Sequence, residues 1–236
     1  MTFDSRRPVI GFITMGGPSL ETELFRSFPQ GLEIVSTRVP FPEVTYARLL
    51  EMTERVPEAA RILAEARPGV IAVTNFIASC IRGKEMVNLI EQATGIPAIV
   101  PAAEYVAILR TMGARTIAIA SCLSNELQIV EQLFFDEYHI RVGRIIQLAE
   151  PGQIDPMAIS LLNRNEAAYK IAQADLSQVD AVIVDMPLFR ITPQACAMLD
   201  RHPIPILTLT QVLLWSTFKK VGAPREGLYL SRFLTP

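Results

Sequence analysis

Two long segments of this chain resemble each other, and this internal repeat restricts the folds open to it. The segment IPAIVPAAEYVAILRTMGA at 96–114 is answered later by IPILTLTQVLLWSTFKKVGA at 204–223. A helix-like run and an apolar strand precede each copy, GVIAVTNF from Gly69 and DAVIVDMPLF from Asp180. The repeat predicts two similar α/β halves, and chains of this kind usually place their chemistry where the halves face each other.

Composition narrows the class of protein. With 236 residues, 50% of them hydrophobic, the chain can bury a sizeable core as one duplicated domain or two small lobes. A net charge of -2 without a basic stripe predicts no nucleic-acid partner. The apolar runs are far shorter than the roughly 20 residues that a bilayer needs, and the start has no signal-peptide pattern. We therefore expect a cytoplasmic protein without a membrane partner.

Strand-like runs that end in turn residues alternate with amphipathic helical patterns. The run from Pro8 stops at MGGPS, and a helix expected over 44–66 returns the chain parallel to it. Near-continuous apolar strands predict parallel sheets covered by helices on both faces. The expected fold is α/β, with a first lobe at 1–113, to which the C-terminal helix could also belong, and a second at 114–236. The lobes should be related by a pseudo-twofold axis, with a site in the cleft between them.

In such folds, ligands bind outside the carboxyl ends of the strands. The candidate site therefore consists of the residues where core strands stop. These are Thr14, Met15, Gly16 and Gly17; Thr74, Asn75, Phe76 and Ile77; Ser121, Cys122 and Leu123; and Asp185, Met186 and Pro187.

Three runs carry a family resemblance. STRVPFPEVTYARLLEMTERVPEAARILAEARPGVIAVTNFIASCIRG, VDAVIVDMPLFRITPQA and TLTQVLLW resemble the maleate isomerase, ectoine-utilisation and arylmalonate decarboxylase branch of the aspartate/glutamate racemase superfamily. The resemblance extends over nearly the whole chain. It implies a homodimer. Within each chain, two cysteines, one from each half of that chain, would face a small carboxylate substrate, with no metal and no organic cofactor.

The chain departs from this family at its reactive positions. Asn75 and Met186 stand where the family has its two cysteines, and neither can abstract a proton or attack a double bond. The family's asparagine after the first strand falls on Gly17, and its Thr-Pro-Tyr falls on 121–123. The chain's own three cysteines are widely spaced, which argues against a disulfide framework or a zinc cluster.

Two side chains remain as candidate catalytic groups. Asp185 could be a general base if burial raises its pKa, or it could be a solvated or helix-capping residue. Cys122 could be a displaced nucleophile, or a small thiol packed in the core.

The ligand and the activity are open at this stage. The MGGPS turn could bind a carboxylate through backbone amides, or it could be a simple turn. Phe76, Ile77, Leu123 and Met186 predict a ligand more apolar than maleate or aspartate, or a closed pocket. Two functions fit the sequence: a cofactor-independent isomerase, racemase or decarboxylase of small carboxylates, or a catalytically silent relative that binds or regulates.

Overall fold

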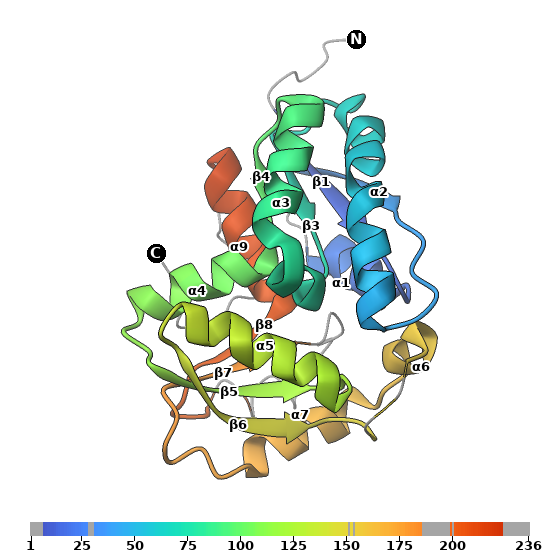
Figure 1. Ribbon diagram of the computed structural model, residues 1–236. Helices are drawn as coiled ribbons and strands as arrows, with labels where there is room; N and C mark the ends of the chain where they lie inside the picture. The colour runs from blue at the N-terminus through green and yellow to red at the C-terminus, as the bar shows by residue number, and fades with distance from the viewer. Residues whose placement is uncertain are drawn as a thin grey trace.

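The computed structural model describes residues 7–27, 31–150, 152, 154–185, 199 and 201–223 (Figure 1). Two four-stranded parallel sheets form its framework, one in each half of the chain. The first has the order β2-β1-β3-β4 and the second β6-β5-β7-β8. The strands are β1 (Val9–Thr14), β2 (Glu33–Arg38), β3 (Val70–Val73), β4 (Ala98–Ile99), β5 (Thr116–Ser121), β6 (Arg141–Gln147), β7 (Ala181–Val184) and β8 (Ile206–Thr208). The predicted pair of parallel α/β lobes is confirmed.

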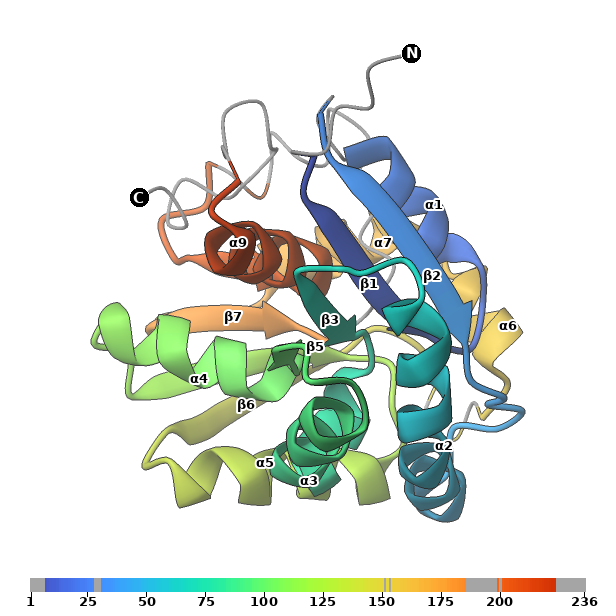
Figure 2. The same ribbon diagram turned by 90° about the horizontal axis from the view of Figure 1, so that it is seen from above.

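Helices cover both faces of each sheet (Figures 1 and 2). They are α1 (Ser19–Ser27), α2 (Tyr46–Ala64), α3 (Phe76–Thr94), α4 (Pro101–Thr111), α5 (Asn125–Glu137), α6 (Pro156–Ser160), α7 (Arg164–Gln173) and α9 (Leu209–Val221). The sequence pattern predicts one helix that ends near Ala172, but the structure has two, α6 and α7, because Asp155 and Asn163 each cap a separate helix start. The pattern also predicts a helix that contains Cys196, and this segment lies outside the described residues, apart from Leu199.

The central strands have the apolar composition that double burial requires. All four residues of β3 and all four of β7 are buried. Successive strand side chains point to opposite faces, so each sheet contributes to two apolar clusters, and each cluster contains residues of both halves. The two lobes therefore share their cores. None of the described helices is long and apolar enough to span a bilayer.

One buried tyrosine joins the halves by hydrogen bonding. Tyr105 of α4 is fully buried, and its hydroxyl lies 3.2 Å from the carbonyl oxygen of Val184 and 3.4 Å from that of Leu207. The helix α9 packs beside α4 and also contacts β3 and α1 (Figure 2). The end of the described chain thus returns to the first half, although the lobe boundaries stay a prediction.

We predict that Tyr105→Phe lowers the free energy of unfolding by about 1–2 kcal/mol, because the ring still packs but buried carbonyls lose a donor. Denaturant unfolding monitored by circular dichroism provides the measurement. Tyr46→Phe, at a tyrosine that is 40% exposed, is the matched control and should stay within about 0.5 kcal/mol of wild type. Equal effects in the two variants would contradict the bridging role of Tyr105.

Candidate functional site

The strand order of each sheet creates a place for a site. Strands are added on opposite sides of β1 in the first sheet and of β5 in the second, so the chain diverges beyond the ends of β1 and β3 and of β5 and β7. A pocket of about 70 Å³ lies where these four strand ends meet. That volume suits a small molecule, since pockets for drug-sized ligands measure roughly 300–1,000 Å³.

Most of the residues predicted for the site line this pocket. Ten of them do so: Met15, Gly16, Gly17, Thr74, Asn75, Phe76, Ile77, Cys122, Leu123 and Asp185. Thr14 and Ser121 are buried outside the pocket lining. Met186 and Pro187 lie outside the described residues. The sequence reasoning missed Phe41, Val44, Pro156, Ile159, Ser160 and Leu209, which also line the pocket.

Asn75 shapes the wall contributed by the first half. It is the N-cap of α3, and its Oδ1 accepts a 2.8 Å hydrogen bond from the backbone N–H of Ala78. The backbone N–H groups of Phe76 and Ile77 belong to the first turn, where an α-helix supplies no partner of its own. Both residues line the pocket, so the helix start brings N–H groups that lack an intrahelical partner, and a partial positive charge, to the pocket wall.

Asp185 is the acidic side chain of the wall contributed by the second half. It follows β7 directly and is only 6% exposed. Its backbone N–H donates to the carbonyl of Ala120 at 3.0 Å, and the hydroxyl of Ser121 donates to its Oδ2 at 3.1 Å. Burial raises the pKa of Asp185 to about 7, and the hydrogen bond from Ser121 limits the rise. Asp185 is thus a buried acid and not a solvated one.

Glu131 of α5 is a second buried acid, which the sequence reasoning did not single out. Its side chain is completely buried, and burial, followed by the nearby Asp185, raises its pKa well above the usual range. Among the described residues, neither carboxyl oxygen of Glu131 has a hydrogen-bond donor as partner, and its interaction is with the carboxyl group of Asp185. A signal was present in the sequence, because Glu131 falls at helical spacing between the buried residues Leu127 and Phe135.

The cysteine at the pocket has surroundings that oppose its ionisation. Cys122 is buried, and burial, with Asp185 and Glu131 nearby, raises the pKa of its thiol far above the ordinary value. A neutral thiol is a poor nucleophile. Within the described ranges, His, Cys, Asp and Glu side chains form no group of three or more that could hold a metal ion.

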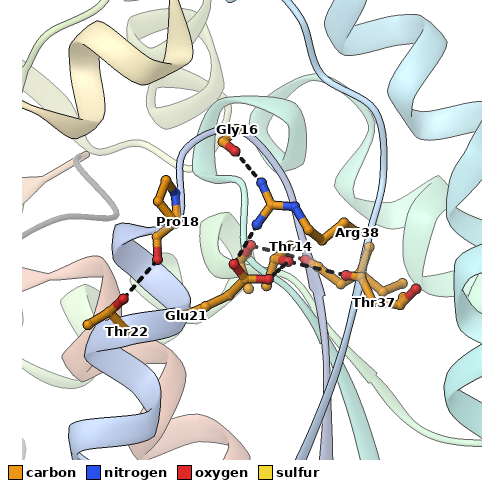
Figure 3. Close-up of polar contacts among 9 residues, drawn as sticks. Thr14, Gly16, Pro18, Glu21, Thr22, Thr37 and Arg38 are labelled. Atoms are coloured by element: carbon orange, nitrogen blue, oxygen red, sulfur yellow. Dashed lines mark hydrogen bonds and ion pairs between the residues drawn. The ribbon is translucent and has the colours of Figure 1, made fainter.

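An ion-paired arginine fixes the glycine turn at the pocket (Figure 3). Gly16 has a φ of 70°, in the left-handed region that favours glycine. The guanidinium of Arg38 donates to the carbonyl of Gly16 and to the carboxylate of Glu21. Thr14 donates to the same carboxylate at 2.7 Å, so its hydroxyl serves this turn and not the pocket.

The short helix α6 of the second half packs directly on the turn of the first. A Cβ atom added at Gly17 would stand 1.4 Å from Oγ and 2.4 Å from Cβ of Ser160. Nearby, the backbone N–H of Val44 donates to the carbonyl of Ile154 at 2.8 Å. Since Pro156, Ile159 and Ser160 all line the pocket, this helix forms part of its wall.

Comparison with known proteins agrees with this architecture. The family model of arylmalonate decarboxylase matches residues 23–234, and the chain belongs to that family. The fold and the branch of the superfamily expected from the sequence are therefore confirmed. A search of curated protein sequences gave no significant match.

Solved structures of two kinds of enzyme share the fold. The maleate cis-trans isomerase of Nocardia farcinica, bound to TRIS, superimposes with a TM-score of 0.82 at 18% identity, over 96% of this chain and 97% of that one. A cysteine-to-alanine variant of the maleate isomerase of Pseudomonas putida S16, with maleate, gives 0.81 at 18% identity, over 96% and 97%. A liganded double mutant of arylmalonate decarboxylase gives 0.78 at 17% identity, over 91% and 93%.

We predict that the stability of this protein falls as the pH rises from about 4 to about 7. The pKa of Asp185 is raised from 3.8 to about 7 in the folded state. The folded chain thus keeps a proton that the unfolded chain releases. This stabilisation, on the order of 4 kcal/mol, is complete below pH 3.8 and lost at about pH 7.

Thermal unfolding between pH 4 and pH 8 tests this expectation. Asp185→Asn should make the dependence on pH less steep, because only Glu131 of the pair then keeps a proton that the unfolded chain releases. It should also raise the Tm at pH 7 and above, because the amide needs no proton. Asp136→Asn removes an exposed acid and should keep the wild-type slope. A wild-type slope that persists in Asp185→Asn would assign the effect to other groups.

We also predict that Gly17→Ala destabilises the protein by roughly 1–3 kcal/mol, because the new methyl group overlaps Ser160. Calorimetry of Gly17→Ala, Ser160→Gly and the double variant forms a mutant cycle. Much of the loss should disappear in the Ser160→Gly background. Additive effects would mean that Gly17 and Ser160 are not in contact.

Proposed function

We propose that this protein is a cofactor-independent enzyme that transfers a proton at the carbon next to a carboxylate, as an isomerase, a racemase or a decarboxylase does. Asp185 is the acid–base group in this proposal. The observation that carries it is a buried carboxyl group at the wall of a small pocket with a pKa of about 7. A group with that pKa is present in both protonation states at neutral pH, which suits acid–base catalysis.

The surroundings of Asp185 suggest how a substrate would lie. The amides at the start of α3 are placed to bind a carboxylate, while Asp185 approaches from the other half. Phe41, Ile77 and Leu123 make part of the wall apolar. The substrate class is therefore a small carboxylic acid with an apolar substituent, more apolar than maleate.

The proposed chemistry differs from that of a relative in which a cysteine becomes covalently bonded to the substrate. A cysteine-to-serine variant of the Nocardia farcinica maleate isomerase was solved with a covalently bound succinylcysteine intermediate. In this chain, Asn75 stands at one family cysteine position and caps a helix. Cys122 is buried and un-ionised. We therefore propose a proton transfer without a thioether intermediate.

A silent binding protein is the second candidate. It is favoured by the use of Asn75 as a helix cap and by the close packing of α6 on Gly17. A silent relative would bind a small carboxylate without exchanging its protons. For either candidate, the family resemblance leads us to propose a cytoplasmic homodimer.

Exchange of substrate protons with deuterated water distinguishes the two candidates without knowledge of the product. We expect the purified protein to catalyse the exchange of hydrogen for deuterium at the α-carbon of one or more α-aryl or α-alkyl malonates or monocarboxylates. NMR spectroscopy of the acid measures the rate of this exchange. The rate should rise with pH through about 7, because the ionised form of Asp185 is the base.

Asp185→Asn should slow the exchange by a factor of about 100 or more, while calorimetric binding of the same acid persists. Asp136→Asn is the control and should exchange like wild type. Exchange that survives in Asp185→Asn would exclude Asp185 as the base. Binding without exchange by the wild type would establish the silent relative.

A further inference from the structure

Two carboxyl groups share one buried space behind the pocket. Glu131 is 0% exposed and Asp185 is 6% exposed. Among the ion pairs that join described residues, none includes either acid. A buried ionised carboxylate without a counter-charge costs far more than a hydrogen bond returns, so the pair must retain at least one proton.

The hydrogen bonding of the pair indicates where that proton is. Within the part of the chain that the structure describes, no N–H or O–H donor bonds to either oxygen of Glu131, and the carboxyl of Asp185 is the group that interacts with it. Two carboxylates cannot bond to each other without a proton between them. Asp185, in contrast, already accepts from Ser121 and lies at the pocket wall. The single negative charge is better placed on Asp185 than on Glu131.

The other described groups that interact with the pair bring no positive charge. Cys80 on α3, Tyr105 on α4 and Cys122 after β5 all interact with both acids, and all have raised pKa values. Each is neutral at physiological pH. The surroundings therefore leave the proton count of the pair unchanged.

We propose that Glu131 is a neutral carboxylic acid in the working protein and donates its proton in a hydrogen bond to the Asp185 carboxylate. Glu131 lies outside the pocket lining, so it is a positioning residue that acts through Asp185. Its donated bond, together with that of Ser121, orients the carboxylate and supports its charge. The role of Asp185 as a base rests on the proposed function, whereas the pairing of the two acids can be tested without a substrate.

Three variants distinguish a protonated Glu131 that donates to Asp185 from an ionised Glu131. In Glu131→Gln, an amide N–H replaces the acid proton, so the apparent pKa of Asp185 should stay within about half a unit of wild type. In Glu131→Leu the donor is lost, and the same pKa should rise by one unit or more. Glu126→Gln, at an exposed glutamate of the same helix, is the matched control and should change nothing.

Infrared difference spectroscopy of the protonated carboxyl stretch, with carbon-13 labelling of Asp or Glu, provides the measurement. Wild type should show one Glu carboxyl band that persists across neutral pH and one Asp band that disappears as pH rises. The persistent band should be absent from Glu131→Gln. A fall of one unit or more in the Asp185 pKa of Glu131→Gln would mean that Glu131 carried a charge, and would overturn the proposal.

The activity measurement then tells the two proposals apart. If exchange occurs, the midpoint of its pH dependence should be unchanged in Glu131→Gln and should shift to higher pH in Glu131→Leu. In each variant this midpoint should match the pKa of Asp185 from the infrared titration. If the infrared pattern holds and no substrate exchanges, the pairing stands and the proposed enzyme function fails. Should Glu131→Leu not fold, the Gln variant and the band assignment decide alone.

Discussion

The site depends on the order in which the strands are added to each sheet. In both halves the chain places its second strand on one side of the first and its third strand on the other. The loops that leave these strands must diverge, which leaves space beyond β1 and β3 and beyond β5 and β7. Because the two halves face each other, both spaces open into one pocket. Asn75 and Asp185 meet there because Asp185 directly follows β7 and Asn75 lies two residues after the end of β3.

Acidic groups are buried at this pocket with no described basic side chain interacting with them, and this determines its electrostatics. Desolvation favours the neutral forms of Glu131, Cys122 and Tyr105 alike. Among these described groups, Asp185 is the one that lines the pocket and accepts a hydrogen bond from the side chain of another residue, Ser121. The region thus concentrates its ionisation in a single carboxyl group. Opposite lies the start of α3, whose amides are attractive to anions.

The sequence predicted the fold and most of the pocket wall because both follow from local patterns. Short apolar runs that end in turn residues locate the strand ends, and the strand ends locate the site. The exceptions are instructive. Thr14 and Ser121 also end strands, but their hydroxyls bond to Glu21 and Asp185, so neither lines the pocket.

What the sequence did not predict depends on contacts between distant segments. The packing of Ser160 on Gly17 joins residues that no local pattern connects. Likewise, Arg38 looks like an ordinary charged residue at a strand end until the carbonyl of Gly16 is found beside it. Glu131 lies between these cases. Its helical spacing marked it as buried, but only the fold reveals that it lies against Asp185.

The two halves repeat each other in topology but not in chemistry, and this has a stereochemical consequence. The end of β3 presents a helix cap and backbone amides, whereas the end of β7 presents an acid supported by a second acid. Within the described part of the chain, a planar intermediate held between them would meet an acidic proton donor on one face, which among the proposed reactions favours decarboxylation over racemisation. An arrangement of that kind distinguishes mirror-image products, whereas two matched thiols on opposite faces would interconvert them.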